Sequence, residues 1–333
     1  MKVKSIVVAV LLILGVTACE KKEIDPPSIK FSNEMEQSLI KVNLDIQEES
    51  STLKAAGVDN WWESINESLV EHGIQLEKME TLGAEQHQGI TIIFKDMGNK
   101  KLSSDFVPND SRNGTGIDVP YIIDGTELGT TSGMTEVDTY NAIVNAMNTW
   151  DNNKCSSGLD IPLWGLIPFD VGFVQYLEGF GGYAGYLAGG ITHGGILPAV
   201  FFDAIGGPGG GTSILGVTFT FIWTSDGVPT DINNDGKNDV AFREVYINDG
   251  FNWQDAPDDV LFNGIYDFET VVLHEVGHGL SQGHFGKAFI TKNGMLHFAP
   301  AALMNSAYSV ARREITQTDL AGHCSIWADW PNN

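Results

Sequence analysis

The most informative stretch of this sequence is residues 274–284, which read His-Glu-Val-Gly-His-Gly-Leu-Ser-Gln-Gly-His. The residues before it predict a helix over 268–280, and Asp267 is suited to cap its N-terminus. On such a helix His274 and His278 lie one turn apart on the same face. Both imidazoles can therefore reach one zinc ion at roughly 2.0–2.1 Å.

The same stretch contains a third histidine and a carboxylate. The glycines at 279 and 283 let the chain turn, so that His284 can return as the third ligand. Three protein ligands leave a position for water and substrate, as catalytic zinc sites require. Glu275 would lie near that water, take its proton and pass it to a leaving amine. Zinc lowers the pKa of the water and polarises a carbonyl, so the pattern predicts metal-assisted hydrolysis.

Two other interpretations of these histidines exist. The first is a helix whose histidines are solvated or satisfy hydrogen bonds in the core. The second is a different clan of zinc peptidases, in which a downstream glutamate such as Glu314 is the third ligand. The position of His284, six residues after His278, favours the three-histidine site.

The pattern resembles the metzincin signature His-Glu-x-x-His-x-x-Gly-x-x-His. Ala302–Asn305 is similar to the Met-turn of that clan, which implies that Met304 forms a hydrophobic floor and that Tyr308 lines a specificity pocket. Residues 267–273 and 318–322 resemble segments of the matrixin subgroup. The resemblance implies a zinc-dependent endopeptidase that acts on protein or peptide substrates.

The expected fold is α+β. The resemblance implies a five-stranded mixed twisted sheet with one antiparallel edge strand, a zinc helix and a C-terminal helix. Strand-like residues occur at 119–123, 217–223 and 240–247, and helices are expected from Thr135 to about Trp150 and from near Thr318. In such enzymes the substrate pairs with the edge strand, which here would be Gly216–Trp223.

Two features depart from the matrixin pattern. Ser281 stands where the family has glycine, although the turn there favours a positive φ that serine adopts reluctantly. Residues 20–115 contain no cysteine, which excludes a cysteine-switch prosegment. If residues 53–113 confer latency, they must therefore use an acid or simple blockage.

The N-terminus predicts export and lipidation. Residues 1–18 combine two lysines with the short apolar run Ile6–Leu14, and Val16-Thr17-Ala18-Cys19 is similar to a bacterial lipobox. Cys19 would carry the lipid anchor, whereas an ordinary secretory signal is the alternative. We expect a tether over 19–52, a small α/β region over 53–113 that is a candidate pro-region, and the catalytic domain over 114–333.

Charge and the remaining cysteines agree with an exported protein. Removing residues 1–18 leaves 17 basic and 43 acidic side chains, a surface that repels nucleic acid. We expect a monomer anchored in the bacterial envelope, at the outer membrane or cell surface rather than the inner membrane. Cys155 and Cys324 can form a disulfide there, and two free buried thiols are the alternative.

A second metal site is predicted in the loop at residues 231–239. Oxygen donors recur around a sharp glycine turn in this loop: Asp231, Asn233, Asp235, the carbonyl of Lys237, and Asp239. The flanks are strand-like, so the interpretation is a calcium-bound hairpin loop, and a metal-free polar turn is its alternative. The function predicted from the whole sequence is a zinc endopeptidase, and a catalytically silent zinc-containing binding lipoprotein of the envelope is the alternative.

Overall fold

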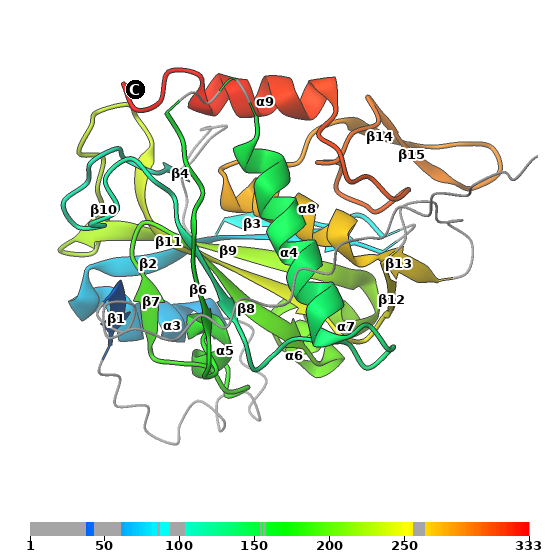
Figure 1. Ribbon diagram of the computed structural model, residues 1–333, viewed down its shortest axis with the longest axis horizontal. Coiled ribbons are helices and arrows are strands. Elements are labelled where there is room, and N and C mark those ends of the chain that lie inside the picture. Colours follow the sequence, from blue (N-terminus) through cyan, green and yellow to red (C-terminus); the bar gives the residue numbers. More distant parts are fainter. Residues whose placement is uncertain are drawn as a thin grey trace, which may run out of the picture.

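The chain folds around one large mixed sheet (Figure 1). The computed structural model describes residues 38–42, 61–84, 87–93, 104–153, 155, 158–255 and 264–332. Within them nine strands form the sheet in the order β3-β2-β9-β11-β8-β5-β6, with β4 beside β11 and β10 beside β9. The strands are β2 (Ile74–Gly83), β3 (Thr91–Ile93), β4 (Ser104–Asp105), β5 (Tyr121–Asp124), β6 (Leu163–Ile167), β8 (Ile191–Leu197), β9 (Ile214–Ser225), β10 (Val228–Pro229) and β11 (Asn238–Asn248).

Strand direction within the sheet is mixed. β6, β5, β8 and β11 are parallel, and β9 is antiparallel to β11. The strands expected at 119–123, 217–223 and 240–247 correspond to β5, β9 and β11. The prediction of a mixed sheet with an antiparallel strand is therefore confirmed.

The prediction of five strands with β9 at the edge is wrong. β2 pairs antiparallel with β9 from Ile74 opposite Trp223 to Gly83 opposite Ile214, and β3 pairs with β2. The described part of residues 53–113 therefore continues the sheet of the following region. An open edge exposes unpaired N–H and C=O groups, and β2 satisfies those of β9. Leu39–Lys41, within the stretch expected to be a tether, forms β1 and pairs with β7 (Gly185–Leu187).

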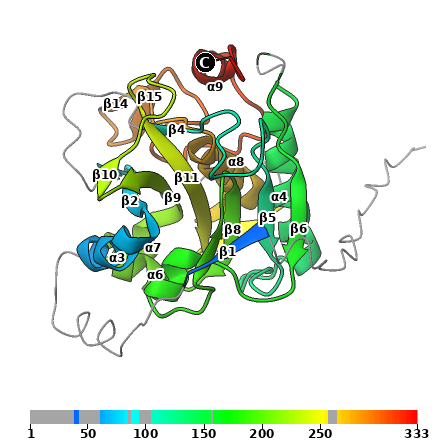
Figure 2. The same ribbon diagram turned by 90° about the vertical axis from the view of Figure 1, so that its left-hand side faces the viewer.

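Helices cover both faces of the sheet, as Figure 2 shows. On one face α4 (Glu136–Asp151) and α8 (Phe268–Gly279) pack together, and the Trp150 indole donates to the Leu273 carbonyl at 2.9 Å. On the other face lies an aromatic core, where the rings of Trp61 and Phe219 are 6.2 Å apart. Alternation along β9 produces this division, because Thr218 faces α8 and Phe219 faces α3. The helices are α3 (Trp61–Leu69), η1 (Val70–His72), α4 (Glu136–Asp151), α5 (Phe173–Leu177), α6 (Ala199–Gly206), α7 (Gly210–Ser213), α8 (Phe268–Gly279) and α9 (Gln317–Trp327).

The C-terminal part is tied back to the sheet layer. Cys155 and Cys324 form a disulfide, which confirms the predicted pair and joins the segment after α4 to α9. Such a bond fits an oxidising compartment outside the cytoplasm. Two small pairs complete the fold: β12 (Asn252–Gln254) with β13 (Ile265–Asp267), and β14 (Lys287–Ile290) with β15 (Leu296–Ala299).

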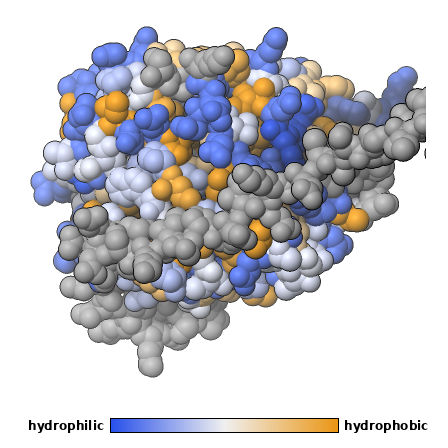
Figure 3. Space-filling view, in the orientation of Figure 1, coloured by the Kyte–Doolittle hydropathy of each residue, from blue (hydrophilic) through white to orange (hydrophobic). Residues whose placement is uncertain are grey.

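The surface and the helix lengths bear on the predicted export. On the face in Figure 3, hydrophilic and hydrophobic side chains are interspersed. No helix in the described ranges is both long and apolar enough to cross a membrane. The leader and Cys19 lie outside the described residues.

Candidate metal centre

The helix that carries the motif is fixed at its start. Asp267 caps α8 by accepting from the Thr270 N–H at 3.0 Å, as predicted, and its carboxylate also pairs with Arg313. Every residue of α8 is buried. The helix therefore presents its polar side chains to the interior of the protein, where each needs a partner.

The three histidines of the motif converge on one point. The Nε2 atoms of His274 and His278 are 3.1 Å apart, those of His274 and His284 are 3.2 Å apart, and those of His278 and His284 are 3.1 Å apart. Nitrogens bound tetrahedrally to zinc at roughly 2.0–2.1 Å would be about 3.3–3.4 Å apart. Within the described ranges, this is the cluster of three or more His, Cys, Asp or Glu side chains that can hold a metal ion. Glu314, the alternative third ligand, is exposed and outside it.

The other ring nitrogen of each histidine is directed at an oxygen. His274 Nδ1 lies 2.8 Å from the Leu303 carbonyl, and His278 Nδ1 lies 2.7 Å from the Gln282 carbonyl. A carbonyl accepts only from a protonated Nδ1, so Nε2 of these two rings carries the free lone pair. Burial lowers the pKa of His274 to about 4 and that of His278 well below its usual value. The rings are therefore neutral near pH 7, which is the form that binds a metal.

The turn to His284 is held by a buried arginine. Ser281 adopts φ 68°, so serine takes the left-handed conformation that the sequence made doubtful. Arg243 donates to the Gly279 carbonyl at 2.7 Å and to Ser281 Oγ at 2.9 Å, and Ser281 Oγ donates to Asp105 at 3.2 Å. These bonds fix the chain between His278 and His284.

The Glu275 side chain extends from α8 toward strand β9. Thr218 donates its hydroxyl to Glu275 Oε2 at 2.7 Å, and the Cα of Gly216 is so near that an added Cβ would lie 2.8 Å from Glu275 Cγ. Burial raises the pKa of this carboxyl well above its usual value. Glu275 Oε1 is buried without a side-chain hydrogen-bond donor in the described residues. A buried oxygen of this kind needs a polar partner, and a water at the three histidines would supply one.

The predicted Met-turn packs beneath the helix. Met304 is fully buried, and its Sδ lies against Gly277, where an added Cβ would approach it to 2.4 Å. The carboxylate of Asp319 accepts from the N–H groups of Leu303 and Met304, both at 3.0 Å. Tyr308 is buried, and its hydroxyl accepts from the Asp267 N–H at 3.1 Å. Met304 and Tyr308 thus lie on the α8 side of the sheet.

Several supporting residues were missed by the sequence analysis: Glu80, Thr218, Arg243 and Asp319. Glu80 Oε1 lies 3.5 Å from His278 Nδ1, and Lys78 Nζ lies 2.8 Å from Glu80 Oε2. Only Asp319 had a signal in the sequence, because it is the third residue of the last helix and forms a capping box with Thr316. The others come from strands whose pairing the sequence did not indicate.

In the loop predicted to bind calcium, the aspartates already bond to N–H groups and charged side chains of the protein. Asp231 accepts from the N–H groups of Asp235 and Gly236, each at 3.0 Å. Asp239 pairs with Arg112 at 2.7 Å, and Lys237 Nζ pairs with Asp105 at 2.8 Å. The carboxylates of Asp231 and Asp239 thus already have protein donors.

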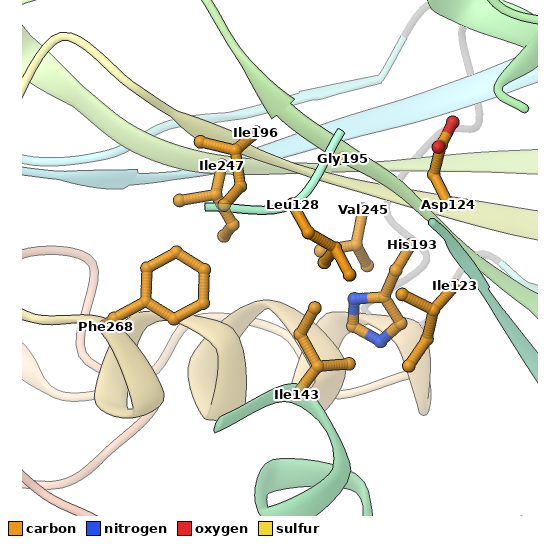
Figure 4. A pocket seen from close by; sticks show the side chains of 10 residues that line it. All are labelled: Ile123, Asp124, Leu128, Ile143, His193, Gly195, Ile196, Val245, Ile247 and Phe268. Carbon is orange, nitrogen blue, oxygen red and sulfur yellow. The ribbon is translucent and has the colours of Figure 1, made fainter. Parts of the chain in front are cut away.

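His193 is not part of the histidine cluster and lines a small cavity (Figure 4). This space of about 10 Å³ is lined mostly by apolar side chains, among them Leu128, Ile143 and Phe268. Burial lowers the pKa of His193 to about 3, so its ring is neutral. The cavity has room for about one water, which suits a structural role for this histidine.

No family model matches the chain, and no curated protein matches it. The case for its activity therefore depends on the residues of the site.

Proposed function

We propose that the protein is a zinc-dependent endopeptidase anchored in a bacterial envelope. The observation that carries the proposal is the convergence of three imidazole nitrogens, two of them from the helix that also carries Glu275. Zinc, when bound, would polarise the peptide carbonyl and acidify the attacking water. The donor set fits zinc, because three nitrogen ligands leave a position for reaction.

The chain's own residues have distinct roles in this proposal. His274, His278 and His284 bind the metal, and the carbonyls of Leu303 and Gln282 orient two of the rings. Glu275 takes the proton of the water and returns it to the leaving amine. Thr218 holds the carboxylate in place for both transfers.

The metzincin resemblance supports the same reaction. Met304 beneath α8 and the antiparallel strand β9 beside the parallel strands agree with that clan's expected arrangement. Substrate would be an extended protein segment, and it could pair with β9 only in the place that β2 occupies. Lipidation at Cys19 and a calcium ion at the 231–239 loop are separate parts of the proposal.

One observation favours the alternative of a silent zinc-containing binding lipoprotein. Strand β2 covers β9 along its length, and Glu275 is wholly buried. In that case the metal would stabilise the fold and no peptide would be cut.

The test is hydrolysis of a mixed fluorogenic peptide library by the purified chain. Glu275→Ala and a zinc chelator are run beside it, and bound zinc is measured in both proteins. The expected result is cleavage that is lost in the variant, which still binds zinc, and lost with the chelator. Zinc binding without cleavage, also after β2 has been displaced from the site, would contradict the endopeptidase.

A further inference from the structure

The last residues of β2 are held between two backbone segments. On one side they pair with β9, and Ala84 donates to the Ser213 carbonyl at 2.8 Å. On the other side Gly83 donates to the Ser306 carbonyl at 3.1 Å and accepts from the Tyr308 N–H at 2.9 Å. An extended chain with backbone partners on both sides is the usual form of a bound peptide.

The direction of this segment is defined by its partners. It runs antiparallel to β9 and parallel to the segment at Ala307. Leu82 is 2 % exposed and belongs to the same core cluster as Met304 and Tyr308. The strand therefore places an apolar side chain beside the residues expected to form a specificity pocket.

Two side chains, one from β2 and one from β3, lie beside the histidine rings. Glu80 lies 3.5 Å from His278 Nδ1, and Thr91 of the paired strand β3 lies 3.4 Å from His284 Nδ1. Leu82 pairs with Gly216, whose Cα packs against the Glu275 side chain. The bond between Thr81 and Leu82 thus has its nitrogen at the residue that would protonate a leaving amine.

We propose that the chain cuts its own Thr81–Leu82 bond. This inference rests on the proposed function and adds a processing site to it. Water adds to the Thr81 carbonyl carbon, the carbon–nitrogen bond breaks, and Glu275 transfers the water's proton to the Leu82 nitrogen. The products are a carboxylate at Thr81 and a new N-terminus at Leu82.

The two pieces stay together after the cut. Leu69, Ile74, Leu76 and Met79 are buried in the core on the far face of the sheet. β2 also keeps its backbone pairs with β9. Cleavage must therefore be read under denaturing conditions, where the pieces separate.

The experiment incubates the full chain, solubilised in detergent, with zinc and identifies N-termini by mass spectrometry. The expected result is a terminus at Leu82 that forms at a rate independent of protein concentration and is absent from Glu275→Gln. Wild-type protein added to Glu275→Gln should not cut it, because the β2 strand of that chain is held in its own site. Ile93→Asp, at an exposed position of β3, is the matched control and should still be processed.

A second measurement does not depend on catalysis. In metal-free Glu275→Gln, amide hydrogen exchange should be slow at Leu82, Gly83 and Ala84, because Leu82 is paired with Gly216 and the other two donate to backbone carbonyls. Fast exchange at these three amides would overturn the placement of the strand in the site.

The remaining outcomes separate this inference from the proposed function. Cleavage of a fluorogenic peptide with Thr81–Leu82 intact overturns self-processing and leaves the endopeptidase standing. If the wild type cuts neither, Leu82→Asp is assayed, or Leu82→Ala where the first does not fold. Peptide cleavage by that variant would mean that β2 blocks the site without being cut, which overturns self-processing alone. No cleavage by that variant overturns both proposals.

Discussion

The histidine cluster and the loop at residues 231–239 use polar side chains in opposite ways. In the cluster three Nε2 atoms face one another at 3.1–3.2 Å, and the oxygens that contact the same rings lie at Nδ1, on the other side. In the loop Asp231 accepts from the loop's own N–H groups, and Asp239 pairs with Arg112. A metal site needs ligand atoms that the protein holds in position without occupying them in its own hydrogen bonds. Of these two regions, the histidine cluster has such atoms.

The largest effect is expected when one of the three histidines is replaced. His284→Ala should lower zinc affinity by roughly 100-fold or more and abolish peptide cleavage, because two imidazoles remain. Glu314→Ala is the matched control, since its side chain is exposed and outside the cluster. Zinc titration and peptide assays of both variants measure this. Loss of zinc in Glu314→Ala would instead support the other peptidase clan.

Metal removal should have the next largest effect. Zinc at about 1,000 times its Kd stabilises the folded state by about 4 kcal/mol. For a chain of this size that corresponds to a fall in Tm on the order of 10 °C after chelation. Thermal unfolding with and without a zinc chelator measures it, and an unchanged Tm would argue that the histidines hold no ion.

Inside the loop, two aspartates should behave differently. Asp239→Ala removes a buried carboxylate that accepts from Arg112, from the Thr230 hydroxyl and from the Ile232 N–H, and we expect a loss of about 2 kcal/mol. Arg112 keeps its pair with Asp110, so its charge is not left without a partner. Asp231→Ala removes turn hydrogen bonds at the surface and should cost about 0.5 kcal/mol. Urea unfolding compares the two, and equal losses would contradict a structural role specific to Asp239.

Substitutions of Ser281, in the turn between His278 and His284, test whether its positive φ is strained. Ser281→Ala and Ser281→Gly both lose the hydroxyl that bonds Arg243 and Asp105, at a cost of about 2 kcal/mol. Glycine adopts the φ of 68° freely, so the glycine variant should be about 1 kcal/mol more stable than the alanine variant. Denaturant midpoints give the difference. An alanine variant as stable as the glycine variant would show that the turn is relaxed.

Calcium addition should have the smallest effect, and it tests whether the loop at residues 231–239 differs from the histidine cluster in metal binding. If the loop's carboxylates are fully used by protein donors, adding millimolar calcium to the zinc-loaded chain should leave its Tm unchanged. A rise in Tm that disappears in Asp231→Ala would place a cation in the loop. The predicted calcium site would then be correct.

Local patterns made the centre of the site predictable. Two histidines four residues apart on a helix must share a face, and Asp267 and Thr135 cap α8 and α4 as expected. These relations involve neighbours within one turn, so the backbone geometry of a helix determines them. The positions of Met304 and Tyr308 beneath and beside α8 were implied only by the family resemblance.

The tertiary structure alone decided what surrounds that motif. Arg243 and Thr218 reach α8 from strands, and β2 covers β9 from a segment more than 130 residues earlier in the chain. No local signal specifies such contacts, because strand pairing depends on which distant edge is left open during folding. The sequence by itself therefore determined that His274 and His278 share one face of the helix, next to Glu275. The packing of remote strands determined that Leu82 lies at Glu275, because only a completed sheet brings these two backbones together.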